Sequence, residues 1–183
     1  MIAGERGQET ASVLCYREIE GCLETLEECG AMVQALGSDG LCAAPAGPES
    51  SIGAHLRHAV EHYLCFLRGL ATGEIDYDNR DRDRDLERCP ETVRKTLDAI
   101  RRELTALGES ASDRPLLLRT LPSRHGDAVQ IETTLRRELV FLANHTIHHL
   151  ALIRVLAQVA GCNTTPEVGL AFSTARFREA EKR

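Results

Sequence analysis

The sequence predicts an all-α protein, a four-helix bundle with a long crossover between the third and fourth helices and a short C-terminal helix. Apolar residues recur at helical spacing over four long stretches, and proline and glycine interrupt the pattern between them. The length of 183 residues suits one domain with a real hydrophobic core. Four amphipathic helices with one extended connection are typical of a helix bundle.

The first helix is predicted at about 8–36. Its apolar face carries cysteines that recur every seven residues, Cys15, Cys22 and Cys29, with isoleucine, leucine and valine completing the pattern. A free cysteine on such a face behaves as a small hydrophobic residue. Because the sequence has no C-x-x-C pair for zinc or redox chemistry, these cysteines are interpreted as core residues. The helix is expected to end near Gly37.

The second helix is predicted to start after an N-cap at Ser50 or Ser51 and to run to about Leu70. The next stretch, "IDYDNRDRDRDLERCP", alternates charges and has no apolar period. It is therefore expected to be a surface connection, pinned to the domain at Ile75 and Tyr77.

The third helix is predicted at about 91–108, because Pro90 is well placed at a helix start. Residues 109–130 contain two prolines and a glycine and are interpreted as an irregular crossover. Within the crossover, "LLLRT" and "AVQIE" are expected to form short extended pieces.

The fourth helix is predicted to begin near Ile131 or Glu132 and to end where the segment 161–183 begins. That segment holds a turn initiated by proline and a short final helix. Residues 1–183 are thus expected to form one domain, with a core of about 8–160 and a C-terminal extension.

Composition excludes several classes of partner. The net charge of −6 argues against binding to a phosphate backbone, which needs a positive surface. No apolar run approaches the ~20 residues of a membrane span, and the N-terminus lacks the apolar region of a signal peptide. The expectation is a cytoplasmic protein that binds neither nucleic acid nor membrane.

Six of the seven histidines fall into two groups on predicted helices. The groups are His55, His58 and His62 in the second helix, and His145, His148 and His149 in the fourth. At about 100° per residue, each group lies on one broad face of its helix. A bundle can bring the two faces together.

These two faces predict a metal site. Neutral imidazole is the commonest metal ligand, and an i, i+4 pair such as His145 and His149 can converge on one ion. A third imidazole from the facing helix gives a three-histidine site with open positions. Spacing alone does not decide whether His55, His58 or His62 supplies it. The alternative is a set of hydrogen-bonded histidines without a metal.

Two other kinds of metal site are disfavoured. In "HTIHH", Thr146 stands where the H-E-x-x-H pattern of zinc proteases has its catalytic glutamate. Neither histidine helix contains the Glu-x-x-His motif of carboxylate-bridged di-iron bundles.

The stretches "SIGAHLRHAVEHYLCFL" and "RELVFLANHTIHHLALI" resemble the DinB-like (YfiT-like) family of metal-dependent enzymes. The order of helices matches that family over about 8–160. The resemblance implies a four-helix bundle that holds a divalent metal with three histidines, and a homodimer. It also implies thiol-dependent S-transferase chemistry as one activity of the family, with a low-molecular-weight thiol as cosubstrate.

Carried over residue by residue, the resemblance implies that His145 and His149 are the His-x-x-x-His ligand pair and that His58 is the third ligand. His55 and His62 are additional to the pattern, and their implied roles are in proton transfer or in contacts behind the ligands; the alternative is that one of them is the third ligand in place of His58. His148 lies beside the ligand pair, where it can orient a substrate.

Three further residues have two interpretations each, and a fourth has one. Cys65 is a thiol near the metal or a small core residue. Glu138 is a hydrogen-bond partner of a ligand imidazole or a residue at the rim. Arg80 belongs to a solvated loop, or covers the metal and binds a carboxylate of a thiol cofactor. His125, in "PSRHGD", is interpreted as an exposed loop residue.

The sequence therefore predicts a metal-dependent enzyme acting on a small-molecule substrate. A divalent ion on His58, His145 and His149 is expected to activate water or a thiol for hydrolysis or S-transfer, with His55, His62 and His148 assisting. Three histidines accept zinc, nickel, iron or manganese, so the metal stays open. The alternative function is a non-catalytic, metal-binding stress-response bundle.

Overall fold

The computed structural model describes residues 5–45, 47, 51–108 and 112–182. It confirms a mostly helical bundle, to which a small sheet is added. The elements follow in the order α1 (Glu5–Cys42), α2 (Ile52–Thr72), β1 (Glu74–Asp76), α3 (Asp85–Arg88), α4 (Pro90–Gly108), β2 (Pro115–Thr120), β3 (Val129–Thr134), α5 (Leu135–Val159) and α6 (Phe172–Glu181).

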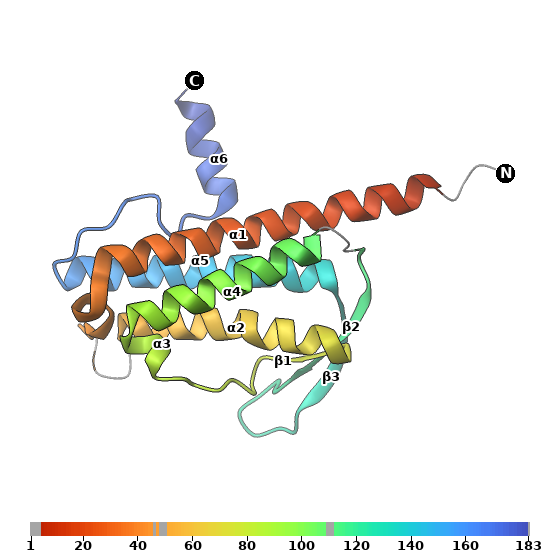
Figure 1. Cartoon of the computed structure of the whole chain (residues 1–183), viewed down its shortest axis with the longest axis horizontal. Helices are drawn as coiled ribbons and strands as arrows, with labels where there is room; N and C mark the ends of the chain where they lie inside the picture. Colours follow the sequence, from red (N-terminus) through yellow and green to blue (C-terminus); the bar gives the residue numbers. More distant parts are fainter. Residues whose placement is uncertain (1–4, 46, 48–50, 109–111, 183) are drawn as a thin grey trace.

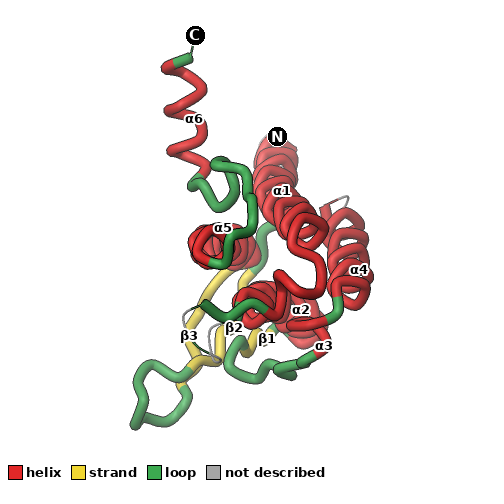
Figure 2. The backbone as a smooth tube through the Cα atoms, turned by 90° about the vertical axis from the view of Figure 1, so that its left-hand side faces the viewer, coloured by secondary structure: helices red, strands yellow, loops and turns green. Residues whose placement is uncertain are grey.

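The four long helices α1, α2, α4 and α5 run side by side and enclose one core (Figure 1). Viewed along their axes, α5 packs against α1 and α2, and α4 lies on the other side of α1 (Figure 2). The cysteine face of α1 is buried as predicted, with Cys15, Cys22 and Cys29 fully inaccessible. The thiol of Cys22 donates a hydrogen bond to the carbonyl of Leu139 on α5 at 3.2 Å.

Helix α1 continues to Cys42, five residues beyond the expected end at Gly37. The glycine does interrupt the helix, because its φ of 59° and ψ of −165° are not helical. A further helical segment follows this kink. A glycine can adopt a positive φ without steric cost, so the residue expected to end the helix bends it instead.

Helix α2 has the predicted N-cap, since the Ser51 side chain accepts a hydrogen bond from the Ala54 N–H at 3.0 Å. The other candidate cap, Ser50, lies outside the described residues. The helix ends at Thr72, within two residues of the prediction, and Gly73 follows in the left-handed conformation.

The two predicted extended pieces are strands of a three-stranded sheet at one end of the bundle (Figure 1). The strand order is β1-β2-β3, with β1 parallel to β2 and β2 antiparallel to β3. The pairing of β1 with β2 was not predicted. Of the expected crossover, residues 109–111 lie outside the described part of the chain.

The predicted start of the fourth bundle helix at Ile131 or Glu132 is wrong. Both residues belong to β3, where Ile131 pairs with Leu118 and Glu132 with Leu117. Helix α5 begins at Leu135, after the Thr134 side chain accepts a hydrogen bond from the Arg137 N–H. The ladder with β2 and the threonine cap together set the boundary.

Helix α5 also corrects the expectation about membrane spans. By length and composition it is apolar enough to cross a membrane. In this fold its buried side chains pack against α1 and α2. Helix α6 differs: it points away from the bundle, and none of its residues, all of which are described, is buried (Figure 2).

Candidate metal centre

The two histidine faces meet between α2 and α5. His58 and His145 lie across from each other, with ring centroids 5.1 Å apart. On one side of this pair, His62 lies 4.5 Å from His58 and 4.2 Å from His145. On the other side, His149 lies 4.6 Å from each of them. The four rings form two triangles that share the His58–His145 edge.

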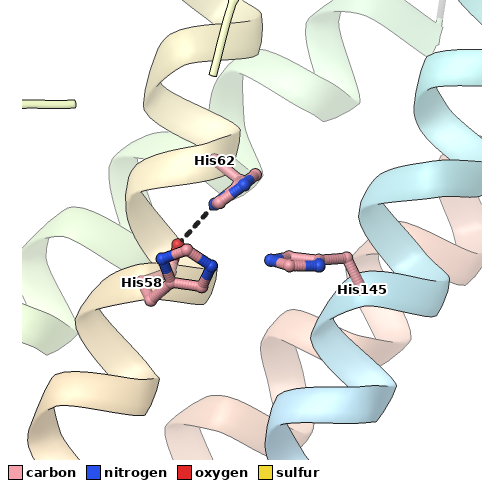
Figure 3. A group of neighbouring side chains, drawn as sticks. All are labelled: His58, His62 and His145. Atoms are coloured by element: carbon pink, nitrogen blue, oxygen red, sulfur yellow. Dashed lines mark hydrogen bonds between the residues drawn. The ribbon is translucent and has the colours of Figure 1, made fainter. Parts of the chain in front are cut away.

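One triangle has its nitrogens already converged. One ligand nitrogen each of His58, His62 and His145 lies within 4.8 Å of the others (Figure 3). The Nδ1 of His62 lies 2.7 Å from the carbonyl oxygen of His58, one turn earlier. Because a carbonyl only accepts, this contact makes Nδ1 the protonated nitrogen and leaves Nε2 with a free lone pair.

In the second triangle, which contains His58, His145 and His149, the His149 ring also contacts His55. The Nδ1 of His149 lies 3.2 Å from the Nδ1 of His55, so one of the two imidazoles donates to the other. Such a contact fixes the orientation of a ring, as outer hydrogen bonds do for metal-ligating histidines. His148 is exposed and its ring contacts that of His149 edge-on, at a centroid distance of 5.4 Å.

The imidazoles are neutral at physiological pH. Burial, helped by the neighbouring histidines and Arg80, lowers the pKa of His58 and His149 to about 3 and that of His62 and His145 to about 4. For His62, the hydrogen bond to the His58 carbonyl and the charge of Asp78 oppose this shift of the pKa. The pKa of His55 is also lowered by burial. A neutral imidazole carries the lone pair that a metal ion needs.

The residues fit a divalent transition metal. The buried Nε2 of His145 has no hydrogen-bond partner among the described residues, although it is surrounded by other imidazoles. A buried polar atom without a partner is costly unless something else satisfies it. Imidazole nitrogens suit zinc, nickel and iron, so a bound ion of this kind satisfies the orphaned atom.

The charged loop after β1 closes one side of this cluster. Arg80 is only 16% exposed, and its positive charge lowers the pKa of four of the histidines. Its guanidinium donates a hydrogen bond to the carbonyl of Tyr77. Most residues of this loop are exposed, as predicted, whereas Arg80 itself is only partly exposed; its role toward a ligand remains a prediction.

Glu138 does not bond to a ligand imidazole, as one of its two predicted roles required. The fully buried carboxyl group accepts hydrogen bonds from Tyr77 Oη at 2.8 Å, Thr133 Oγ1 at 2.6 Å and Arg137 Nη1 at 2.7 Å. The ring of Tyr77 stacks on His62, with centroids 5.1 Å apart and planes inclined by 24°. Glu138 thus reaches the cluster through Tyr77.

The remaining candidates lie apart from the cluster. Cys65 is a buried residue whose sulfur lies 3.3 Å from Arg68 Nη2 and 3.8 Å from the carbonyl oxygen of Asn79, and burial raises its pKa. It is absent from the group of converging ligand atoms found in the described chain. His125 is exposed in the turn between β2 and β3, as predicted. The contact of Tyr77 with His62 was not predicted. The expectation that Tyr77 fixes the loop to the domain was the one feature of the sequence that indicated a buried contact for this residue.

Replacing Tyr77 by phenylalanine is expected to keep the ring stacked on His62 and to remove the bond to Glu138. One buried acceptor oxygen then loses its donor, so we expect the free energy of unfolding to fall by about 1–3 kcal/mol. Urea denaturation measures it. The matched control is Tyr16→Phe, because Tyr16 is 55% exposed, and a change within about 0.5 kcal/mol is expected there. Equal stabilities of the two variants would contradict the role of this bond.

The chain is similar to one known superfamily over most of the bundle. The family model of the DinB superfamily matches residues 24–153, from α1 through most of α5. A curated relative, FK506-binding protein 5 of Rhizopus delemar, is 28% identical over 101 residues, which are 55% of this chain and 26% of that protein. The chain thus spans about a quarter of the length of that relative. No solved structure matches. The match over most of the bundle, which includes both histidine faces, shows that the chain belongs to the DinB superfamily.

Proposed function

We propose that this protein is a metal-dependent enzyme that holds one divalent transition-metal ion between α2 and α5 and acts on a small molecule. The observation that supports the proposal is the buried Nε2 of His145, which has no partner among the described residues and faces other neutral imidazoles. Four rings packed this closely, with no acidic residue in the group of converging ligand atoms of the described chain, are costly unless an ion binds their lone pairs.

His58 and His145 are ligands in this proposal because both triangles contain them. For the third ligand we propose His149, as the His-x-x-x-His pattern of the family implies. The centroid of its ring lies 4.6 Å from that of each of the other two, so rotation of the side chain can present Nε2 without moving α5. The His55 contact at Nδ1 then supplies the outer hydrogen bond.

His62 is proposed as the general base. Its Nδ1–H is bonded to the carbonyl of His58, which leaves the Nε2 lone pair as the proton acceptor on the side of the cluster. Tyr77 stacked on the ring holds its plane. The exposed His148 lies at the rim, where it can contact a substrate.

The reaction proposed is S-transfer from a low-molecular-weight thiol, or hydrolysis, at an electrophilic centre. A bound divalent ion supplies Lewis acidity that lowers the pKa of a thiol or water. In S-transfer, the thiol proton passes to Nε2 of His62, the new sulfur–carbon bond forms, and the leaving group departs with its electron pair. Hydrolysis follows the same course with water as the proton donor and nucleophile.

Elemental analysis of protein purified without a histidine tag tests the metal. About one equivalent of a transition metal is expected, as in a three-histidine site. The variants His62→Ala and His149→Ala then separate the two triangles: we expect metal to be lost in His149→Ala and retained in His62→Ala. The reverse result would assign the third position to His62, and metal below about one tenth of an equivalent in the wild type, unrecovered by reconstitution, would overturn the proposal.

Cobalt-substituted protein separates an enzyme from a structural metal-binding bundle. If the ion has an open position, adding a thiol such as 2-mercaptoethanol is expected to produce a sulfur-to-cobalt charge-transfer absorption. A closed coordination sphere gives no such band and supports the non-catalytic alternative. His62→Ala is expected to keep the band while slowing thiol consumption by about 10²-fold or more, since it removes the base and not a ligand.

A further inference from the structure

The loop between β1 and α3 is fixed against α2 on the histidine side. Tyr77 at its start is bonded to Glu138 of α5. Near its end, the Asp83 N–H donates a hydrogen bond of 2.7 Å to Glu61 Oε1. Between these anchors, Arg82 has a φ of 54°, in the left-handed region that non-glycine residues rarely adopt. A strained residue held between two anchors is typical of functional loops.

Arg80 lies between these anchors and has spare hydrogen-bonding capacity. Among the contacts of the described residues, its guanidinium donates one hydrogen bond, to the Tyr77 carbonyl. Its Nε lies 4.0 Å from Glu61 Oε2, which is beyond hydrogen-bond distance. The same oxygen lies 3.8 Å from the Nε of Arg57. Glu61 is thus shared by two guanidinium groups and satisfies neither, so most N–H groups of Arg80 are available to a ligand.

The charges around the cluster favour an anion. Arg57 and Arg80 are balanced by Glu61 and by Glu87, which pairs with Arg57. The imidazoles add no charge. The carboxylate of Asp78 accepts hydrogen bonds from the Leu121 N–H at 2.8 Å and from Thr120, and its single negative charge, which raises the pKa of His62, offsets only part of a divalent charge. A divalent ion on neutral ligands therefore leaves an uncompensated positive charge next to a guanidinium.

We propose that Arg80 binds the carboxylate of an anionic small-molecule thiol or substrate whose reacting group lies at the histidine centre. This inference rests on the proposed function, since it needs an ion at the cluster. The planar guanidinium matches a carboxylate through two parallel N–H···O bonds, which a lysine does not reproduce. Arg80 is a specificity residue in this scheme, and His62 still takes the proton.

The experiment compares two ligands that differ only in charge, 3-mercaptopropionate and 3-mercaptopropionamide, by calorimetric titration into the zinc-loaded full chain. The wild type is expected to bind the acid about tenfold more tightly than the amide, which corresponds to a difference in binding free energy of about 1.4 kcal/mol. In Arg80→Gln the acid and the amide are expected to bind equally, with unchanged zinc content. The matched control is Arg84→Gln, an exposed arginine of the same loop, which is expected to keep the preference.

Arg80→Lys is a second variant that tests the inference if Arg80→Gln does not fold. It keeps the charge and loses the planar fork, so its preference for the acid is expected to lie between those of the wild type and Arg80→Gln. A full preference in Arg80→Gln, or no preference in the zinc-loaded wild type, would overturn the inference and leave the proposed function intact. A wild type that binds no zinc would overturn both.

Discussion

Replacing His145 by alanine is expected to lower the metal content of the purified protein from about one equivalent to less than about one tenth. His145 belongs to both histidine triangles, so the loss is expected whichever residue is the third ligand. Its Nε2 is the buried atom left without a partner among the described residues. The two imidazoles that remain are too few to retain the ion through dialysis.

The same variant changes the response of thermal stability to metal. An ion that binds the folded state alone stabilises the wild type by about 2.7 kcal/mol when its free concentration is 100 times the Kd. We expect zinc to raise the melting temperature of the wild type and to leave that of His145→Ala unchanged. His125→Ala is the matched control, because His125 is exposed in the β2–β3 turn. One equivalent of metal in His145→Ala would contradict the assignment of the metal site to this cluster.

The helical parts of the fold could be predicted because their signals are local. The seven-residue repeat of Cys15, Cys22 and Cys29 predicts which face of α1 is buried, and Ser51 predicts where α2 begins. The sheet could be predicted only in part. The parallel pairing of Glu74 with Leu117 joins residues far apart in sequence, and no local pattern contains that contact. The antiparallel ladder between β2 and β3 contains Ile131 and Glu132, the residues predicted to start the fourth helix.

The site follows the same division. Helical spacing alone places His58, His145 and His149 on inward faces, and the structure brings these three rings together. It also brings in His62, whose nitrogen converges with those of His58 and His145. Which nitrogens converge depends on side-chain rotation and on the separation of two helices, and neither is encoded in spacing.

Contacts across the chain explain the roles that sequence left open or assigned wrongly. The sequence makes Glu138 a candidate partner of a ligand imidazole, because it lies on the same helix face as His145, seven residues earlier. In the fold, its oxygens are bonded to Tyr77, which arrives from a loop 61 residues earlier, and to Thr133 and Arg137. Arg80 lies in a run of alternating charges that reads as solvated. Two anchors of that loop, at Glu138 and Glu61, turn it toward the histidines.

Gly53→Ala is expected to lower the free energy of unfolding by about 4 kcal/mol or more, a loss that single substitutions reach only through a defined structural conflict. A Cβ atom at Gly53 would lie 1.9 Å from the carbonyl oxygen of Glu87 and 2.7 Å from its carbonyl carbon. These are backbone atoms of α3, so no side-chain rotation relieves the overlap, and α3 must move away from α2.

That movement is expected to reach the candidate site as well. Glu87 pairs with Arg57, and the loop that carries Arg80 is attached to α2 just before α3, through the Asp83 N–H and Glu61. Gly30→Ala is the matched control: its Cβ would meet only Leu97 Cδ1, at 4.0 Å, inside helix α1. There we expect a gain of about 0.5–1 kcal/mol, because alanine loses less backbone entropy than glycine in a helix. Urea denaturation measures the free energy of unfolding of both variants, which is expected to fall in Gly53→Ala and to rise in Gly30→Ala. A Gly53→Ala protein whose free energy of unfolding lies within about 1 kcal/mol of the wild-type value would contradict the close packing of α2 on α3.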